Sequence, residues 1–189
     1  MDRGFFKPLL DKTLAILLVV LFSPLVLLTS FLILIKMGKP LFFKQIRPGK
    51  DEKSFFIYKF RTMTNEKDSQ GNLLSDEARL KGFGKLIRSL SLDELPQLWS
   101  ILKGDMSFVG PRPALFNQDD LIALRTEKGV EKLLPGLTGW AQVNGRDELP
   151  ISQKVELDVE YLQRHSFLFD LKILWVTFLK VVKRQDVSH

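Results

Sequence analysis

The sequence contains no cysteine, which excludes disulfide bonds, cysteine-ligated zinc or iron–sulfur centres and a thiol nucleophile. Histidine is almost as scarce, since only His165 and His189 are present. Two histidines leave little room for a histidine metal site or for a histidine-relayed catalytic triad. Any chemistry that this chain performs must therefore use carboxylates, hydroxyls, lysine and arginine.

The overall composition is that of an ordinary globular protein. Of the 189 residues, 45% are hydrophobic and 26% are charged, which excludes disordered and fibrous architectures. The length suits one domain with room for a short appendage. A net charge of +6 and an isoelectric point near 9.5 favour anionic partners, namely phosphates, nucleic acid or acidic lipid.

One long uncharged run lies near the N-terminus, at residues 13–35 between Lys12 and Lys36. As a helix it is ~35 Å long, enough to cross the ~30 Å hydrocarbon core of a bilayer. The run is longer than the apolar core of a removable signal peptide, and no small-x-small cleavage pattern follows it. The simplest interpretation is a single membrane-spanning helix.

Two features of this run favour a different topology. Ser23 and Pro24 lie in its middle, where proline kinks a helix and leaves two arms of only ~16 Å each. Basic residues, which normally mark the cytoplasmic side, flank both ends of the run. A re-entrant hairpin explains both features, and a kinked span stays open as the alternative. The flanking residues are Arg3, Lys7 and Lys12 on one side and Lys36, Lys39, Lys44, Arg47 and Lys50 on the other.

The chain after residue 36 predicts a small, α-rich α+β domain at 37–189, distinct from a membrane segment at 1–36. Apolar strands at 41–47 and 54–61 flank a Pro-Gly turn at 48–51 and predict a β-hairpin. Residues 64–75 are predicted to be a polar loop, and residues 104–113 and 135–147 are rich in glycine and proline. Helical patterns cover residues 76–89, 94–103, 117–128, 151–164 and 168–184.

The last predicted helix is amphipathic and has two interpretations. Its apolar face could pack on the core of the domain, which is the ordinary use of such a face. Alternatively the helix lies in the membrane interface, which Trp, Phe and basic residues beside an apolar anchor favour. The apolar face holds Leu171, Leu174, Trp175, Phe178, Val181 and Val182, the polar face holds Asp170, Lys172, Lys180, Lys183 and Arg184, and Ile173 and Val176 are exceptions.

Two adjacent carboxylates, Asp93 and Glu94, are the first candidates for chemistry. In a structural interpretation Asp93 is a helix N-cap, because Pro96 then falls where the missing N–H would have no intrahelical partner. In a functional interpretation the helix N-terminus keeps a carboxylate ionised and attracts phosphate. Adjacent carboxylates can then act as nucleophile and as Mg2+ ligand. The residues alone leave both interpretations open.

Several basic residues in turn-rich contexts are candidates for binding phosphate, which arginine can hold with two hydrogen bonds. Lys59 and Arg61 end the second strand, and Arg88 precedes the acidic pair. Arg112 lies between two prolines, and Arg146 ends a run whose glycines, at positions 136, 139 and 145, would let a ligand approach the backbone. Any one of these arginines could equally be a solvated surface group. The excess of basic residues in 36–61, eight against two acidic ones, could also serve only to attract anionic lipid.

The sequence has no P-loop, dinucleotide-binding glycine motif, nucleophile elbow or HExxH. Four of its runs resemble the bacterial sugar transferases, or monotopic phosphoglycosyl transferases. The runs are KFRTM at 59–63, RSLSLDELPQLW at 88–99, GDMSFVGPRP at 104–113 and PGLTGWAQVNGR at 135–146. They occur in family order and cover most of the chain. The short length is similar to that of the smallest members, which initiate N-linked protein glycosylation in campylobacters.

The resemblance implies transfer of a phospho-sugar from a UDP-sugar to polyprenyl (undecaprenyl) phosphate, with release of UMP. It implies a ping-pong reaction in which Asp93 is the nucleophile that forms a phosphosugar–aspartyl intermediate, while Glu94 holds Mg2+. Lys59, Arg88, Arg112 and Arg146 would then neutralise phosphate charge. Similarity to the smallest members suggests an N-acetylated amino-deoxy sugar, such as diacetylated bacillosamine.

The same resemblance implies that the N-terminal segment is a re-entrant helix–break–helix, with the break at Ser23 and Pro24. The active site then faces the cytoplasm on the bacterial inner membrane. Two alternatives remain: a membrane hydrolase of lipid phosphates or pyrophosphates, and a non-catalytic basic adaptor that binds anionic lipid or nucleic acid. We expect no nucleic-acid partner, because the acidic pair would repel a polyanion if it lay on the same face.

Overall fold

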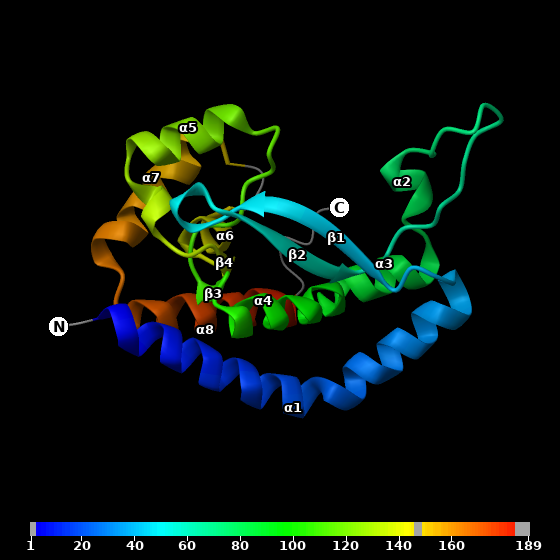
Figure 1. The fold of residues 1–189 in the computed structure, drawn as a ribbon, viewed down its shortest axis with the longest axis horizontal. Coiled ribbons are helices and arrows are strands. Elements are labelled where there is room, and N and C mark those ends of the chain that lie inside the picture. The colour runs from blue at the N-terminus through cyan, green and yellow to red at the C-terminus, as the bar shows by residue number, and fades with distance from the viewer. Residues whose placement is uncertain (1–2, 146–148, 184–189) are drawn as a thin grey trace.

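A long N-terminal helix underlies a β-hairpin and a group of shorter helices (Figure 1). This computed structural model describes residues 3–145 and 149–183. The predicted α-rich α+β fold is confirmed. In chain order the elements are α1 (Arg3–Met37), β1 (Phe42–Pro48), the 3-10 turn η1 (Lys50–Glu52), β2 (Ser54–Phe60), α2 (Asp76–Arg79), α3 (Gly82–Ser89), the 3-10 helix η2 (Leu92–Gln97), α4 (Leu98–Lys103), β3 (Ser107–Val109), α5 (Asp119–Glu127), η3 (Val130–Lys132), β4 (Gly136–Thr138), α6 (Trp140–Asn144), α7 (Ile151–Arg164) and α8 (Phe167–Lys183).

The helix α1 continues through Ser23 and Pro24 and bends near its middle (Figure 1). Proline has no N–H to offer the carbonyl of Val20, which lies one turn earlier. The Ser23 hydroxyl donates to that carbonyl instead, at 2.8 Å. This bond keeps the Val20 carbonyl satisfied, which lipid could not do. The break predicted at Ser23 and Pro24 is therefore a bend in a continuous helix.

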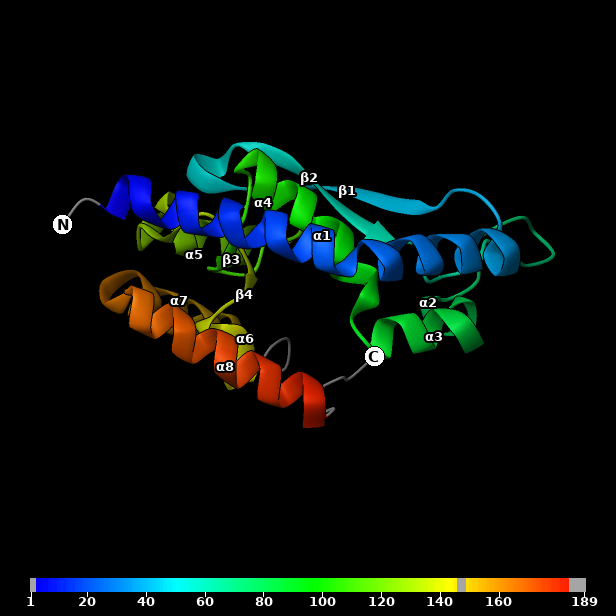
Figure 2. The ribbon, with the colours of Figure 1, turned by 90° about the horizontal axis from the view of Figure 1, so that it is seen from below.

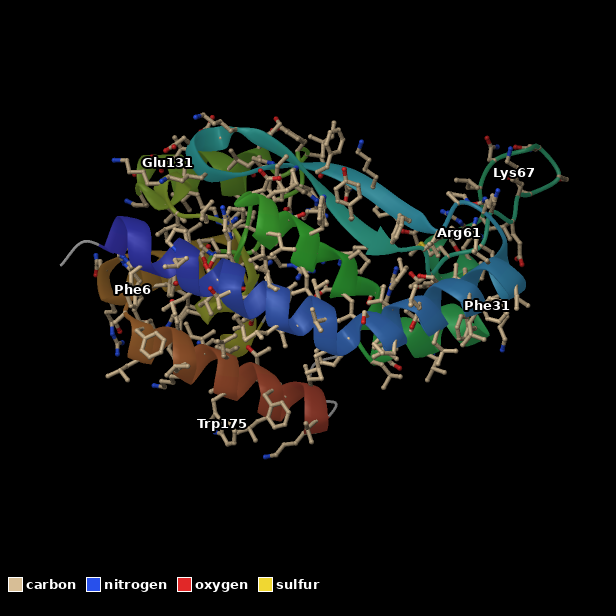
Figure 3. All side chains as sticks on the ribbon, turned by 60° about the horizontal axis from the view of Figure 1, so that its bottom comes forward. Phe6, Phe31, Arg61, Lys67, Glu131 and Trp175 are labelled. Carbon is tan, nitrogen blue, oxygen red and sulfur yellow. The ribbon has the colours of Figure 1, made fainter. Side chains whose placement is uncertain are left out.

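Most large apolar side chains of α1 point away from the protein, among them Phe6 and Phe31 (Figure 3). Leu27 is 70% exposed and Val20 is 68% exposed, which is unusual for apolar residues of a folded protein. Within residues 3–145 and 149–183, α1 is the one helix that is long and apolar enough to cross a membrane. The apolar run predicted at 13–35 thus forms a helix with a lipid-like surface.

Both halves of α1 are nevertheless attached to the rest of the protein. Near its start, the ammonium of Lys7 lies 2.6 Å from the carboxylate of Asp170 on α8. Ala15 is buried in the main core, and Ile33 is buried in a second core. At the C-terminal end, the Arg61 guanidinium donates to the carbonyls of Met37, the last residue of the helix, and of Gly38, which follows it. The two ends of α1 are therefore fixed to the same body.

The predicted hairpin is confirmed, because β1 and β2 pair antiparallel with Phe42 opposite Phe60 and Pro48 opposite Ser54. Side chains alternate between the two faces of a strand. Phe55 and Ile57 are buried in the main core, so the same alternation directs Lys59 toward the inside of the protein. The hairpin thus carries a lysine inward near its open end.

The helix bounds predicted from the sequence agree with the structure to different degrees. The pattern at 151–164 gives the bounds of α7, and α5 and α8 begin or end within two residues of expectation. The helix expected at 76–89 is divided into α2 and α3 at Gly82, whose φ is +42°. The helix expected at 94–103 is divided into η2 and α4. Two short strands and α6 lie in segments expected to be irregular, because three-residue strands carry no detectable period.

The glycines of the 135–146 run serve packing where the structure describes them. A Cβ on Gly136 would lie 2.2 Å from the backbone nitrogen of Gly110, and one on Gly139 would lie 2.1 Å from its carbonyl oxygen. A Cβ on Gly145 would lie 2.8 Å from the Leu149 side chain. These close approaches are therefore to the protein itself, and the prediction that these glycines expose the backbone to a ligand is wrong.

The apolar face of α8 is largely exposed rather than buried. Phe169 and Ile173 are the buried residues of this helix, whereas Trp175 is 62% exposed and Phe178 is 56% exposed. Phe169 and Ile173, which lie outside the predicted face, belong to the main core, and of the predicted face only Leu174 packs against it. Packing of the predicted face as a whole on the core is therefore wrong. Seen from below, α8 lies beside α1, and Trp175 points outward (Figures 2 and 3). Both helices thus carry large exposed apolar side chains.

Candidate active site around Asp93 and Glu94

Asp93 and Glu94 lie in the first turn of η2, the 3-10 helix between α3 and α4. Ser91, just before it, adopts a left-handed conformation with φ of 53° and makes no side-chain capping bond. Pro96 is accommodated inside the short 3-10 helix. Asp93 is therefore a residue of the helix and not its N-cap, so the predicted capping role of Asp93 is wrong.

The carboxyl of Asp93 is buried, with only 5% of the residue exposed. Burial, and after it the adjacent charge of Glu94, raise the pKa of Asp93 to about 6, even though the charges of Lys59 and Arg88 lower it. A buried carboxylate that titrates near neutrality is unusual for a structural residue and common in active sites. Asp93 is thus a weakly solvated carboxyl with two cations nearby, which makes it a candidate nucleophile or base.

Glu94 forms an ion pair with Lys59. The Lys59 ammonium, which projects from β2, lies 2.6 Å from a carboxylate oxygen of Glu94. Both side chains are about a quarter exposed, with 27% and 26% of their surface accessible, so the pair is open to solvent on one side. The fold thus brings together a lysine and a glutamate that are 35 positions apart.

Arg88 reaches the same site from α3. Its guanidinium donates to the hydroxyl of Thr62 at 3.0 Å, and its charge lowers the pKa of Asp93. Four of the predicted site residues, Lys59, Arg88, Asp93 and Glu94, therefore meet in one place. Sequence reasoning did not single out Thr62, although it belongs to the KFRTM run that carries the resemblance.

The other predicted arginines do not join this group in the described residues. Arg112 lines a small pocket at the turn end of the hairpin, together with Pro48 and Gly49. Lys59 lies five residues along β2 from that end, or ~17 Å at the rise of a strand. Arg146 lies outside the described residues. The predicted roles of Arg112 and Arg146 in phosphate binding stay predictions.

Comparison with known proteins identifies the family. The profile described as "Bacterial sugar transferase" matches residues 2–184. The "Uncharacterized sugar transferase EpsL" of Bacillus subtilis is 51% identical over 97% of this chain and 90% of its own length. A UDP-N-acetylgalactosamine-undecaprenyl-phosphate N-acetylgalactosaminephosphotransferase of Aeromonas hydrophila is 36% identical over 95% of this chain. A UDP-glucose:undecaprenyl-phosphate glucose-1-phosphate transferase of Caulobacter vibrioides is 38% identical over 89%. The chain belongs to the bacterial sugar transferase family.

The chain spans only part of the length of several relatives. It spans 66% of the Caulobacter protein, 44% of the Aeromonas protein and 38% of a UDP-glucose:undecaprenyl-phosphate glucose-1-phosphate transferase of Xanthomonas campestris. The matched region nevertheless contains the hairpin, η2 and both long helices. The family relationship therefore covers every element that builds the site around Asp93.

The donor set of this sugar transferase suits a hard divalent cation. No group of three or more histidine or acidic residues that could hold a metal occurs among the described residues. Asp93 and Glu94 offer carboxylate oxygens only, and Glu94 reaches solvent. Mg2+ is commonly bound by one or two carboxylates together with substrate phosphates and water. The residues present therefore fit Mg2+ that binds together with a phosphorylated substrate.

The raised pKa of Asp93 predicts how Asp93→Asn changes stability. Between about pH 4 and pH 6 the folded state holds a proton that the unfolded state has lost, so wild-type stability falls as pH rises through this window. Asparagine removes this cost, and we expect the variant to be more stable by about 1–3 kcal/mol above pH 6, with the gain vanishing near pH 4. Thermal unfolding in detergent with EDTA, across this pH range, measures the difference. A constant difference at every pH would contradict a buried, ionising carboxyl.

Proposed function

We propose that this protein is a phosphoglycosyl transferase that moves a sugar 1-phosphate from a UDP-sugar to undecaprenyl phosphate. The observation that carries the proposal is the buried Asp93, which lies with Glu94, Lys59 and Arg88 in a chain that also carries a long, apolar and largely exposed helix. A nucleophile in this position can receive an anionic nucleotide-sugar from water and a phosphate from the membrane. The names of the Aeromonas and Caulobacter relatives support the same pair of substrates.

The reaction follows from the groups present. In the first half, a carboxylate oxygen of Asp93 attacks the phosphorus attached to the sugar, and the bond between that phosphorus and the bridging oxygen breaks, so UMP leaves. In the second half, an oxygen of the lipid phosphate attacks the same phosphorus. The bond to Asp93 breaks, which restores the carboxylate and yields undecaprenyl-diphosphate-sugar. Both halves bring anions together, so neutralisation of charge should dominate catalysis.

Lys59 and Arg88 supply part of that neutralisation. Arg88 can present two N–H groups to one phosphate, and Lys59 acts as a mobile point charge. Mg2+ held by Glu94 would supply the rest, by lowering the negative charge of the diphosphate. Without metal, Lys59 neutralises Glu94 at 2.6 Å. Any cation that binds Glu94 would therefore release Lys59 toward the substrate.

The attachment of α1 supports a monotopic topology, in which the protein enters the membrane and leaves on the same side. Lys7 binds Asp170 at one end of α1, and Arg61 binds the last carbonyls at the other. A straight span would place these ends on opposite sides of the bilayer, which would break one set of contacts. The exposed face of α8 would then lie in the interface of the bacterial inner membrane, with the active site facing the cytoplasm.

Labelling of single cysteines tests this topology, because the natural sequence has none. Cysteines introduced at Phe6 and Lys39 should show the same accessibility to an impermeant reagent. We expect both to be protected in intact cells and both to react in inverted membrane vesicles. Opposite accessibility of the two positions would contradict the re-entrant arrangement and support a kinked span.

The donor is the least constrained part of the reaction. We propose an N-acetylated amino-deoxy sugar, such as UDP-diacetylbacillosamine, as the sequence resemblance to the small members of the family suggests. The relatives' names specify UDP-glucose and UDP-N-acetylgalactosamine. A panel of these three donors therefore discriminates among the candidates, with UMP release as the common measurement.

The decisive test omits the lipid. The purified chain is incubated with each UDP-sugar and Mg2+, and we expect one donor to give a covalent phosphosugar adduct by intact mass, mapped by peptide analysis to Asp93. Addition of undecaprenyl phosphate should then discharge the adduct into lipid product. If free sugar phosphate accumulates without lipid, the protein is a hydrolase. If UMP forms only when both substrates are present and no adduct is trapped, the ping-pong mechanism is wrong.

A further inference from the structure

Four consecutive residues at the end of β2 connect the active site to the membrane helix. Lys59 binds Glu94. Phe60 is 1% exposed and packs with Ile33 of α1 and Ile87 of α3. The segment continues with Arg61, which binds the end of α1, and with Thr62, which accepts a hydrogen bond from Arg88. One short stretch of chain therefore contacts the catalytic pair, the helix that carries Arg88, and the C-terminal half of α1.

Arg61 is the link to α1. The residue is only 7% exposed, and its guanidinium lies between the strand and the end of the helix (Figure 3). It donates to the carbonyl of Lys39 at 2.9 Å, to that of Gly38 at 2.8 Å, and to that of Met37. The last carbonyls of a helix have no intrahelical donors. Arg61 satisfies three acceptors at and beyond this helix end with one rigid group, and its positive charge favours the negative end of the helix dipole.

Thr62 is the link to α3. Its hydroxyl accepts the hydrogen bond from Arg88, and its backbone packs directly on Gly84, where an added Cβ would lie 1.8 Å from the Thr62 oxygen. The backbone of this segment therefore lies in close contact with α3, at a position where only glycine fits. If α1 moved relative to Arg61, the depth of Asp93 relative to the membrane would change. The contacts of Lys59 with Glu94 and of Thr62 with Arg88 would still hold the side chains of the site together.

We propose that Arg61 is a positioning residue that sets the height and orientation of Asp93 relative to the membrane, and thereby the rate of transfer to the lipid acceptor. This inference rests on the proposed function. The phosphate of a polyprenyl lipid is held at a fixed depth by its chain, whereas a nucleotide-sugar arrives freely from water. Movement of the site relative to α1 therefore penalises the second half-reaction and leaves the first one unaffected.

The test separates the two half-reactions. Arg61→Gln keeps a polar side chain but removes the positive charge and the planar set of guanidinium N–H donors. Arg61→Lys keeps the positive charge but loses that planar set of donors. We expect adduct formation from UDP-sugar to stay near the wild-type rate in both. Discharge of the preformed adduct by undecaprenyl phosphate in nanodiscs should fall about 100-fold in Arg61→Gln, as expected for a reacting group displaced by ~1 Å, and less in Arg61→Lys.

A second variant disturbs the same helix end without changing Arg61. Gly38 has a φ of 72°, and open space surrounds the position of its missing Cβ, so Gly38→Ala introduces backbone strain but no clash. We expect a slower lipid step and a normal adduct step. Arg164→Gln is the matched control, because Arg164 pairs with Glu160 on the surface of α7, and we expect both of its steps to match the wild type.

A short, water-soluble acceptor provides the readout that a purely structural defect would not change. The phosphate of geranyl phosphate is not confined to one depth in the bilayer. The rate of phosphosugar transfer to geranyl phosphate, divided by the rate of transfer to undecaprenyl phosphate, should therefore rise in Arg61→Gln. Equal losses in adduct formation and in both transfers, or unchanged rates throughout, would overturn the inference. Absence of an adduct in the wild-type protein would instead contradict the proposed function.

Discussion

Asp93→Asn is expected to abolish the phosphosugar adduct and to lower the rate of overall transfer by about 10⁴–10⁶-fold, as removal of a catalytic nucleophile commonly does. Asparagine has nearly the shape of aspartate but cannot donate an electron pair to phosphorus from an anionic oxygen. The measurements are intact mass after incubation with the donor and Mg2+, and radiolabelled transfer to undecaprenyl phosphate. Intact mass also excludes deamidation of the variant back to aspartate.

The buried position of Asp93 makes this variant informative. The carboxyl is destabilising for the fold when ionised, since burial and then Glu94 raise its pKa to about 6, so asparagine should fold at least as well as the natural residue. Asp120→Asn on α5 is the surface control and should keep both adduct and transfer. Substantial turnover by undeamidated Asp93→Asn would remove Asp93 from the role of nucleophile. Loss of activity with gain of stability is the signature of a catalytic residue retained at the expense of the fold.

The sequence predicted the parts of the fold that have a clear period. The strands of the hairpin and α7 follow from alternation and from helical spacing, because each buries a regular set of apolar side chains. The same reasoning failed for α8, whose predicted core face is exposed apart from Leu174, while Phe169 and Ile173 lie in the core. Helical spacing shows that a face is apolar but does not show whether protein or lipid covers it.

The site was only partly predictable, because its geometry depends on contacts between distant segments. Asp93 and Glu94 stand out locally, yet the local pattern favoured an N-cap that the 3-10 helix does not use. Lys59 meets Glu94 only because the hairpin folds over η2. Arg61 was a candidate for phosphate binding on residue type alone, but it binds backbone carbonyls at the end of α1. Residue type and local spacing identify candidates, and tertiary contacts assign their roles.

Glu94→Gln is expected to lower transfer by about 100-fold or more, because a catalytic metal ion supplies several kcal/mol of charge stabilisation and an amide is a weaker ligand for Mg2+ than a carboxylate. The variant also tests what Glu94 does. Removing its charge should lower the pKa of Asp93, since Glu94 is, after burial, the group that raises it. The nucleophile would then be more fully ionised near pH 6.

The two possible roles of Glu94 therefore predict opposite results. If Glu94 acted only through the charge state of Asp93, the variant would be faster than the wild type near pH 6. If it holds Mg2+, adduct formation falls at every pH, and more Mg2+ is needed to reach half of the maximal rate. Titration of Mg2+ at pH 6 and pH 8 measures both effects, with Glu127→Gln on the surface of α5 as the control. An unchanged Mg2+ requirement would show that other groups hold the cation. A ligand that loses its negative charge binds a divalent cation more weakly, so the requirement must rise if Glu94 is a ligand.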